Sequence, residues 1–418
     1  MSQRTIVWVA IFTVIALMFW RLPQLVAEQD AVYRTYGVLL EADALIRQKY
    51  VHDVDDERLV EGAVRGMLRR LDPYCAYITP QQRDWLRRRT RGEYVGVGVE
   101  VAKRNGAWTV ISPIEDGPAD RAGVMPGDAI VAVDGRDVES MSVLDIDRMF
   151  AGSAGSEVTL TIRRDGEEPT RRVAIRRGPV SITTVRGSGK TDDGRWNFMV
   201  DPDDRLGYIR VSDFSEITVR DFDAALKLLT QAGVRGLIID LRDNPGGLMH
   251  EAIRMVDRFV AGGPILATVT RRKVVQRYQA SPDDTIEDIP LVVLVNGGSA
   301  SSSEIVAGSL QARGRAVVVG QRTFGKGSVQ HLITLSDAVS AIKLTVAYYQ
   351  LPNGRFIHRT PSNKKTDEWG VTPDVIVDAG DGERPKTGPT AEIPDDRQLA
   401  VALEDLRKRT TTATVPGE

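Results

Sequence analysis

A buried strand, a tight turn and a helix start follow one another in Leu291-Val-Val-Leu-Val-Asn-Gly-Gly-Ser-Ala-Ser-Ser-Ser-Glu304. Five successive apolar residues are typical of a strand whose two faces are both covered. Similar apolar runs occur at 206–211, 236–241 and 316–319, and amphipathic segments lie at 218–232, 248–260 and 303–313. Strands that alternate with helices predict a layered α/β domain with a mostly parallel sheet, which we place at residues 181–380.

The serine run Ser299–Ser303 has two interpretations. A linker or a helix cap is the simpler one, because small polar residues favour both. The run, however, is joined closely to a buried strand and leads directly into a helix. Such a junction exposes a nucleophile, and the amides at the helix N-terminus can stabilise an anion. Ser301 is therefore a candidate nucleophile.

A lysine that could serve as its base follows the next apolar strand, in Thr323-Phe-Gly-Lys326-Gly-Ser-Val-Gln330. A desolvated lysine can take the proton of a serine hydroxyl. No acidic residue occurs at 317–330, which favours the neutral amine. Gly320–Lys326 also matches a phosphate-binding loop, but Gly327 stands where that loop needs Ser or Thr. Residues 328–335 alternate like a strand, whereas a phosphate-binding loop leads into a helix.

A histidine base is the alternative to Lys326, since His250 and His331 lie near these loops. No Gly-x-Ser-x-Gly motif surrounds Ser301, as a nucleophile elbow requires. His331 follows Gln330 in a strand, so their side chains point to opposite faces. A Ser–Lys pair is thus favoured over a Ser-His-Asp triad.

A glycine pair follows another buried strand, in Asp240-Leu-Arg-Asp-Asn-Pro-Gly-Gly247. Glycines permit a close backbone approach and unusual dihedral angles. On its own this segment is better explained as a plain strand-to-helix turn. Beside a serine nucleophile it could supply an amide to an oxyanion hole.

The composition bounds the class of protein. The chain has 418 residues, of which 42% are hydrophobic and 27% charged, as in folded proteins of two or three domains. The net charge of -2 gives no indication of nucleic-acid binding. The single cysteine, Cys75, and four scattered histidines show no metal-ligand spacing, so we expect neither a metal nor a cofactor.

The N-terminus carries a signal for export. Ile6 to Trp20 is apolar except for Thr13, and it lies between Arg4 and Arg21. The run is short for a spanning helix, which needs about 20 residues, but it reaches a plausible span when extended to Ala27. We expect residues 1–27 to be an uncleaved membrane anchor, with the catalytic part on the periplasmic or extracytoplasmic side. A cleaved signal peptide is the alternative.

Three further segments complete the expected domain organisation. Helical periodicity predicts a helical region at 28–92. Short strands and turns predict one compact domain at 93–180. We expect a mobile tail at 381–418, with one short helix at 395–409.

Several motifs occur together along the chain. They are Ser299–Ile305, Ala307-Gly308, Gly314-Arg-Ala316, Thr323–Gln330, Leu241–Gly247, Leu71-Asp-Pro-Tyr74, Tyr94–Gly98 and Gly370-Val-Thr-Pro-Asp374. Over about residues 32–378 the chain resembles the carboxyl-terminal processing peptidases (tail-specific proteases). The resemblance implies a helical dimerisation region, an inserted PDZ domain of permuted type, and a catalytic core related to the crotonase and Clp protease architecture.

The resemblance also implies roles for individual residues. Ser301 is the nucleophile, Lys326 the general base and Gln330 the residue that orients the lysine. The backbone amides of Gly247 and Ser302 form the oxyanion hole. Many members have alanine where this chain has Ser302, which is harmless because only the amide is needed. Many also have aspartate where this chain has Ala312, so a carboxylate at that position takes no part here.

A peptide-binding role is implied for the PDZ domain. Gly96-Val97-Gly98-Val99 resembles the loop that binds a C-terminal carboxylate, and apolar C-terminal residues are the expected ligand. A PDZ domain that has lost peptide binding is the alternative.

These features together predict a serine endopeptidase that cleaves exported proteins near their C-termini, with the PDZ domain recognising the tail or gating access. Expected partners are protein substrates, a second copy or a larger homo-oligomer, and an activating adaptor. The competing hypothesis is a catalytically silent PDZ scaffold on a protease-like core.

Overall fold

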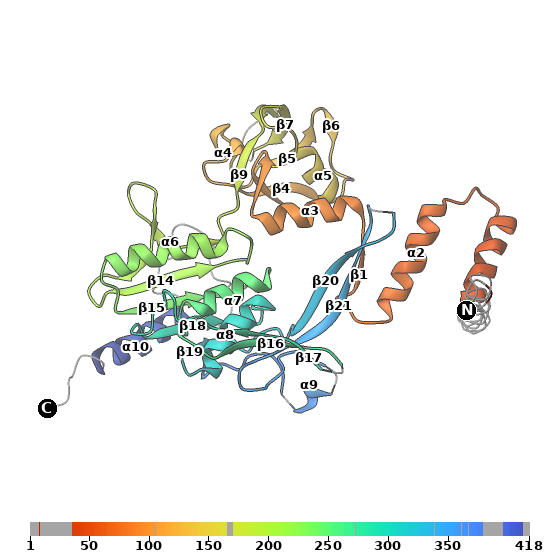
Figure 1. Ribbon diagram of the computed structural model, residues 1–418. Helices are drawn as coiled ribbons and strands as arrows, with labels where there is room; N and C mark the ends of the chain where they lie inside the picture. The colour runs from red at the N-terminus through yellow and green to blue at the C-terminus, as the bar shows by residue number, and fades with distance from the viewer. Residues whose placement is uncertain are drawn as a thin grey trace. The chain divides into compact units, whose positions relative to one another are not determined.

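The computed structural model describes residues 8, 36–104, 106–164, 170–271, 273–337, 339–360, 362–366, 368–378 and 396–412. Its contacts divide the chain into two compact units, Met1–Leu71 and Asp72–Glu418. Figure 1 labels the elements of both units.

The first unit is helical where it is described. Residues 36–49 form a helix, and α2 spans Asp56–Arg69 with the Asp55 side chain as its N-terminal cap. Exposed apolar side chains on these helices include Leu39, Leu40 and Val60. Apart from Trp8, the expected anchor at 1–27 lies outside the described residues. Among the residues described, no helix is long and apolar enough to cross a membrane.

A parallel sheet forms the centre of the second unit, as the apolar runs predict. Its strands are β14 (Leu206–Val211), β15 (Gly236–Asp240), β18 (Leu291–Val295), β19 (Ala316–Gly320) and β22 (Val375–Ile376), paired in this order. Antiparallel strands β10 (Val185–Arg186) and β13 (Met199–Asp201) pair with β14. Asp240, Leu294 and Val319 are in register, so the loops after β15, β18 and β19 leave from the same edge.

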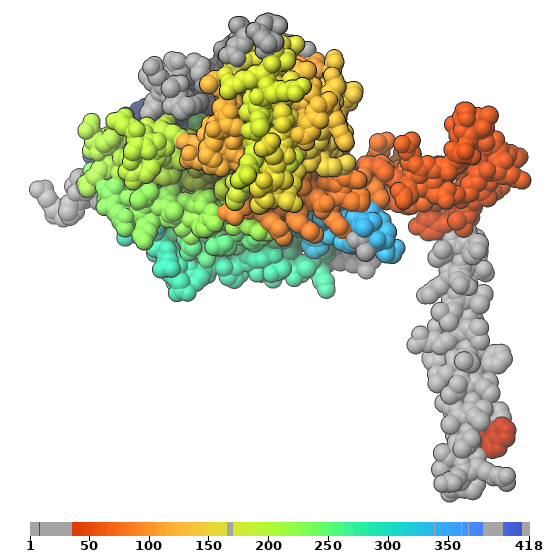
Figure 2. Space-filling view, turned by 90° about the horizontal axis from the view of Figure 1, so that it is seen from above, coloured from red at the N-terminus to blue at the C-terminus, as the bar shows by residue number. Residues whose placement is uncertain are grey.

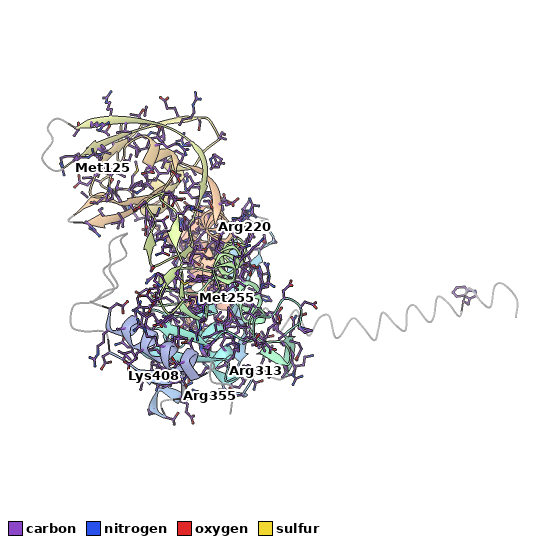
Figure 3. All side chains as sticks on the ribbon, turned by 90° about the vertical axis from the view of Figure 1, so that its left-hand side faces the viewer. Met125, Arg220, Met255, Arg313, Arg355 and Lys408 are labelled. Atoms are coloured by element: carbon purple, nitrogen blue, oxygen red, sulfur yellow. The ribbon has the colours of Figure 1, made fainter. Side chains whose placement is uncertain are left out.

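Helices cover both faces of this sheet (Figure 1). On one face lie α6 (Thr218–Gln231), α7 (Met249–Asp257) and α8 (Ser302–Ala312). Met255 of α7, labelled in Figure 3, is fully buried in the core on that face. On the other face, α10 (Arg397–Thr412) buries Leu399, Ala402 and Leu406. The helix expected in the tail is therefore present, but it is part of the core, which corrects the expectation of mobility for this segment.

A second sheet is antiparallel in each of its described strand pairs. It contains β1 (Ala76–Ile78), β16 (Pro264–Val269), β17 (Val274–Gln279), β20 (Ser328–Thr334) and β21 (Ala341–Gln350). Within 28–92, expected to be helical, β1 is a strand because its residues pair with Ala341–Lys343. Helix α3 (Pro80–Arg91) follows, with Thr79 as its N-terminal cap and Pro80 in its first turn. Short α9 spans Asn363–Thr366.

The predicted compact domain of short strands has its own sheet and core, coloured orange to yellow in Figure 2. The sheet order is β3 (Val99–Arg104), β4 (Ala107–Pro113), β5 (Ala129–Val133), β7 (Glu157–Arg163) and β8 (Arg171–Arg176), with β6 (Arg136–Asp137) paired to β5. Helices α4 (Pro118–Arg121) and α5 (Val143–Phe150) complete it. Two further pairs are β2 (Glu93–Gly96) with β9 (Gly178–Ser181), and β11 (Gly189–Lys190) with β12 (Trp196–Asn197).

Candidate active site

Ser301 stands at the junction that the sequence predicts, between β18 and α8. It caps α8, is only 5% exposed, and has φ 56° and ψ -111°. A non-glycine residue rarely adopts a positive φ, and such strain persists only where the surrounding structure enforces it. The backbone of Ser301 is therefore held in place by its neighbours.

The glycine pair provides part of that hold. Gly246 has φ 100°, and a Cβ there would come within 2.7 Å of Ser301 Cβ and 2.9 Å of Ser302 N. Gly247 has φ 147°, and a Cβ there would overlap the carbonyl oxygen of Phe214. Only glycine allows this loop to lie directly against the serine turn.

The two amides expected to form the oxyanion hole are free. Phe214 N donates to Gly246 O at 3.1 Å, and Leu248 N donates to Phe214 O at 2.7 Å. In this pairing the amide of Gly247, which lies between these two positions, makes no hydrogen bond. Ser302 is the first residue of α8, where an amide has no acceptor within the helix. Neither amide donates to another residue in the described part of the chain. Both amides are thus free to bind an oxyanion.

Glu304 joins the serine turn to the lysine loop. Its Oε2 accepts hydrogen bonds from the backbone amides of Ser301 and Lys326, both at 2.8 Å. Its Oε1 accepts from Gly325 N at 2.7 Å and from Thr323 Oγ1 at 2.5 Å. One buried carboxylate therefore fixes the backbones of both candidate catalytic residues.

Lys326 has a pKa below its ordinary value. Burial is the main cause, because it disfavours the ammonium form, and the nearby charge of Lys343 adds to the effect. Glu304 acts in the opposite direction and raises the pKa of Lys326. The sequence predicts no carboxylate near the lysine, because none occurs at 317–330. The structure corrects this expectation, since folding brings Glu304 close to Lys326. Burial likewise raises the pKa of Glu304, against the effect of its hydrogen bonds.

The side chains of the two residues are not hydrogen-bonded to each other. Lys326 Nζ lies over the ring of Tyr74, 5.6 Å from its centroid, and among the described contacts no hydrogen bond joins it to Ser301. A hydrogen-bonding interaction with Ser301 lowers the pKa of Tyr349, although burial dominates and raises that pKa to about 12. Tyr74 belongs to the motif Leu71-Asp-Pro-Tyr74, but its position beside Lys326 is visible only in the structure. The same is true of the interaction between Tyr349 and Ser301.

The other predicted participants have separate contacts. Gln330 Nε2 donates to Ser328 Oγ at 3.0 Å, beside a bulge between Val329 and Gln330 in β20. Its predicted role in orienting the lysine remains a prediction. His331 is exposed, and the exposed ring of His250 faces Glu251 at 3.6 Å. Among the contacts of the described residues, neither His250 nor His331 has one with Ser301.

Comparison with known proteins identifies the family. The chain is 37% identical over 338 residues to a carboxy-terminal-processing protease of Bartonella bacilliformis, covering 80% of this chain and 73% of that protein. It is 33% identical over 325 residues to the carboxy-terminal processing protease CtpA of Bacillus subtilis, covering 78% and 67%. The chain belongs to the carboxy-terminal processing protease family. It is a serine-type peptidase.

Family models place three regions along this carboxy-terminal processing protease. Residues 205–377 match peptidase family S41, 109–164 match a PDZ domain, and 25–81 match the N-terminal domain of the activating protease CtpB. The predicted α/β core with an inserted PDZ domain and a helical N-terminal region is confirmed. Among solved structures, a photosystem II D1 C-terminal processing protease aligns with TM-score 0.48 and 33% identity, over 79% of this chain and 84% of that one.

The predicted peptide-binding loop of the PDZ domain lies between β2 and β3. Val97 is buried, and Gly98 has φ 74°. The carbonyls of Val97 and Gly98 accept hydrogen bonds from Ala119 N and Ile114 N, both at 2.8 Å. Within the described residues β3 is an edge strand of its sheet. An extended peptide could add to such an edge.

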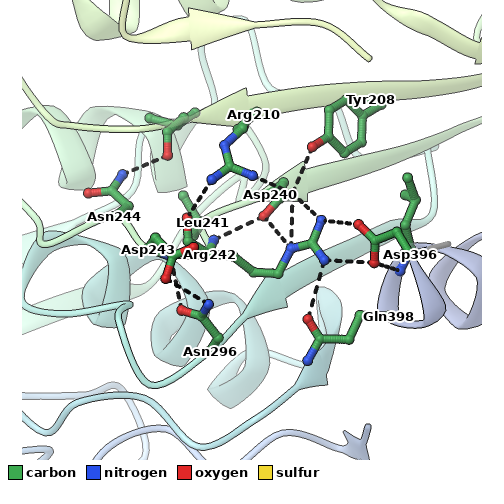
Figure 4. Close-up of polar contacts among 12 residues, drawn as sticks. Tyr208, Arg210, Asp240, Leu241, Arg242, Asp243, Asn244, Asn296, Asp396 and Gln398 are labelled. Carbon is green, nitrogen blue, oxygen red and sulfur yellow. Dashed lines mark hydrogen bonds and ion pairs between the residues drawn. The ribbon is translucent and has the colours of Figure 1, made fainter. Parts of the chain in front are cut away.

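A buried charge network anchors the segment that leads to the glycine pair (Figure 4). The Arg242 guanidinium contacts Asp240 at 2.6 Å and Asp396 at 2.7 Å, and Tyr208 donates to Asp240 at 2.7 Å. Burial alone would raise the pKa of Asp240, but Arg242 and Arg210 lower it to about 2. The network ties the segment before α10 to the loop that carries Gly247 in this protease.

Proposed function

We propose that the chain is a serine endopeptidase that cleaves exported proteins near their C-termini with a Ser301–Lys326 dyad. One observation carries the proposal: a single carboxylate oxygen, Glu304 Oε2, holds the amides of both residues at 2.8 Å. The depressed pKa of Lys326 supports it, because a lysine base must be neutral at working pH.

The reaction follows from these positions. Neutral Lys326 accepts the Ser301 hydroxyl proton while Oγ attacks the peptide carbonyl. The amides of Gly247 and Ser302 bind the resulting oxyanion. As the tetrahedral intermediate collapses, the Lys326 ammonium gives its proton to the leaving amine, and an acyl-enzyme remains. Lys326 then takes a proton from water, which attacks the ester carbonyl. As this second tetrahedral intermediate collapses, Lys326 returns the proton to Ser301 Oγ, which releases the new carboxyl terminus and restores both residues.

Catalysis requires a rearrangement of the lysine side chain. Lys326 Nζ must move from the ring of Tyr74 to the hydroxyl of Ser301. We assign Gln330 to hold the lysine in that second position, with its side-chain oxygen as acceptor. The amide nitrogen of Gln330 can keep its bond to Ser328 at the same time.

Location and assembly form a separate part of the proposal. An extracytoplasmic location and an N-terminal anchor are supported by the apolar segment Ile6–Trp20. Association with a second copy or an activating protein is supported by exposed apolar side chains on the helices of the first unit, among them Leu40, Leu45 and Val60. Substrates are proteins, as the family implies.

Substrate recognition by the PDZ loop leads to a prediction. A test protein that ends in apolar residues should be cleaved with a lower KM when its C-terminus is a free carboxylate than when it is amidated. The backbone amides of the 96–99 loop can bind the free carboxylate but not the amidated C-terminus. We expect a loss in kcat/KM of about tenfold to one-hundredfold, the value of one or two charge-assisted hydrogen bonds. Steady-state kinetics on the semisynthetic pair measures it.

The outcomes separate the hypotheses. Equal kcat/KM for the two substrates would mean that the PDZ domain has lost carboxylate binding. Binding of the free C-terminus without any cleavage, at the pH where the lysine is neutral, would favour the silent scaffold.

A further inference from the structure

Tyr74 lies against the candidate base although it is far from it in the sequence. Its ring centroid is 5.6 Å from Lys326 Nζ. The residue stands in a turn just before β1, which pairs with β21. Asp72 Oδ1 accepts hydrogen bonds from Tyr74 N and Cys75 N, both at 2.8 Å, so the turn is fixed. The turn and the pairing of β1 with β21 therefore hold the aromatic ring beside the lysine.

The charged groups around this contact come from several elements. Lys326 is influenced by Lys343 of β21, which lowers its pKa, and by Glu304 of α8, which raises it. Around the ring of Tyr74 lie the charges of Asp72 and Arg359, and the ring of His358 packs edge-on with centroids 5.9 Å apart. None of these groups is hydrogen-bonded to Lys326 Nζ among the described contacts.

A cation over an aromatic face is attracted by the ring quadrupole, whereas a neutral amine is not. The contact therefore distinguishes the two protonation states of Lys326. We infer that Tyr74 is a positioning residue that holds the Lys326 ammonium away from Ser301 and releases the side chain to the serine when the lysine loses its proton. This inference rests on the proposed role of Lys326 as base.

Removing the aromatic face of Tyr74 should increase activity at acidic pH. Tyr74→Leu keeps an apolar cover but removes the aromatic face, so the ammonium loses stabilisation and the pKa of Lys326 falls. The acidic limb of the kcat/KM profile should move to lower pH by about half a unit to one unit. Below that limb, activity should rise about threefold to tenfold. Tyr74→Phe keeps the face and should leave the limb in place.

A second variant covers the case in which Tyr74→Leu does not fold. Pentafluorophenylalanine at position 74 preserves the approximate size of the ring but reverses its quadrupole, so it should shift the limb in the same direction as leucine and at least as far. If the acidic limb of the kcat/KM profile stays in place or moves to higher pH in the folded variants, Tyr74 only shields the lysine from water. The inference would then be wrong.

A direct titration separates this inference from the proposed mechanism. In the Ser301→Ala protein, lysines can be labelled by reductive ¹³C-methylation and Lys326 assigned from the signal absent in Lys326→Arg. Adding Tyr74→Leu should lower the pKa of that signal by the same half to one unit. An unchanged pKa refutes the role of Tyr74 whatever the activity. A lowered pKa together with full activity in Lys326→Ala supports Tyr74 and refutes the dyad.

Discussion

Replacing Ser301 with alanine is expected to reduce kcat by about 10⁴- to 10⁶-fold, the range lost when a serine nucleophile is removed. The strained Ser301 at the start of α8 lies beside the free amides of Gly247 and Ser302. The hydroxyls of Ser302 and Ser303 donate to backbone carbonyls instead. Without Oγ no acyl-enzyme can form. Single-turnover cleavage of a protein substrate, with the unfolding temperature measured in parallel, tests this.

Ser309→Ala is the matched control. Ser309 is also a buried serine of α8, and its hydroxyl donates to Ile265 O at 2.8 Å. Loss of this hydrogen bond should lower the free energy of unfolding by about 1 kcal/mol and leave kcat unchanged. Cleavage that survives in Ser301→Ala, or that disappears equally in Ser309→Ala, contradicts the assignment of the nucleophile.

Replacing Glu304 with alanine is expected to damage both activity and stability. Three backbone amides, of Ser301, Gly325 and Lys326, lose their buried acceptor. An unsatisfied buried donor costs about 1–3 kcal/mol, so the free energy of unfolding should fall by at least about 3 kcal/mol. Because the serine turn and lysine loop are no longer tied together, kcat should fall about 10²-fold or more in the protein that remains folded.

Glu251→Ala separates the two effects. Glu251 is an equally buried glutamate, on α7, and it accepts from Val219 N at 3.0 Å. Its removal should destabilise the protein and leave kcat close to that of the unmodified enzyme. Chemical denaturation measures the free energy of unfolding of both variants, and steady-state kinetics measures their kcat. If Glu304→Ala loses stability but keeps its kcat, Glu304 is only a structural residue.

The sequence predicts most of the core because the relevant signals are local. The apolar run Leu291–Val295 identifies a covered strand, and the small residues that follow identify the serine turn. The glycine pair is visible too, although only the structure shows that a Cβ at Gly246 would meet Ser301.

What the sequence does not predict depends on tertiary contacts. Glu304 reads as an ordinary residue of a helix's first turn, yet it binds amides more than twenty residues later in the chain. The three-residue strand β1 has no periodicity of its own and forms because β21 offers it a partner. In α10, the apolar residues Leu399, Ala402, Leu403 and Leu406 do follow helical spacing. That spacing predicts the helix, but it does not show that the helix packs against the sheet through these residues.

The most direct test of the Ser301–Lys326 dyad is chemical replacement of the lysine amine. Lys326→Cys, made together with Cys75→Ser so that position 326 carries the only thiol, should be inactive. Alkylation with 2-bromoethylamine then restores an amine whose sulfur lowers its pKa. Cleavage is then expected to return, with the acidic limb of its pH profile at lower pH than that of the native enzyme. Activity before alkylation, or none after it in a folded protein, would contradict Lys326 as the base.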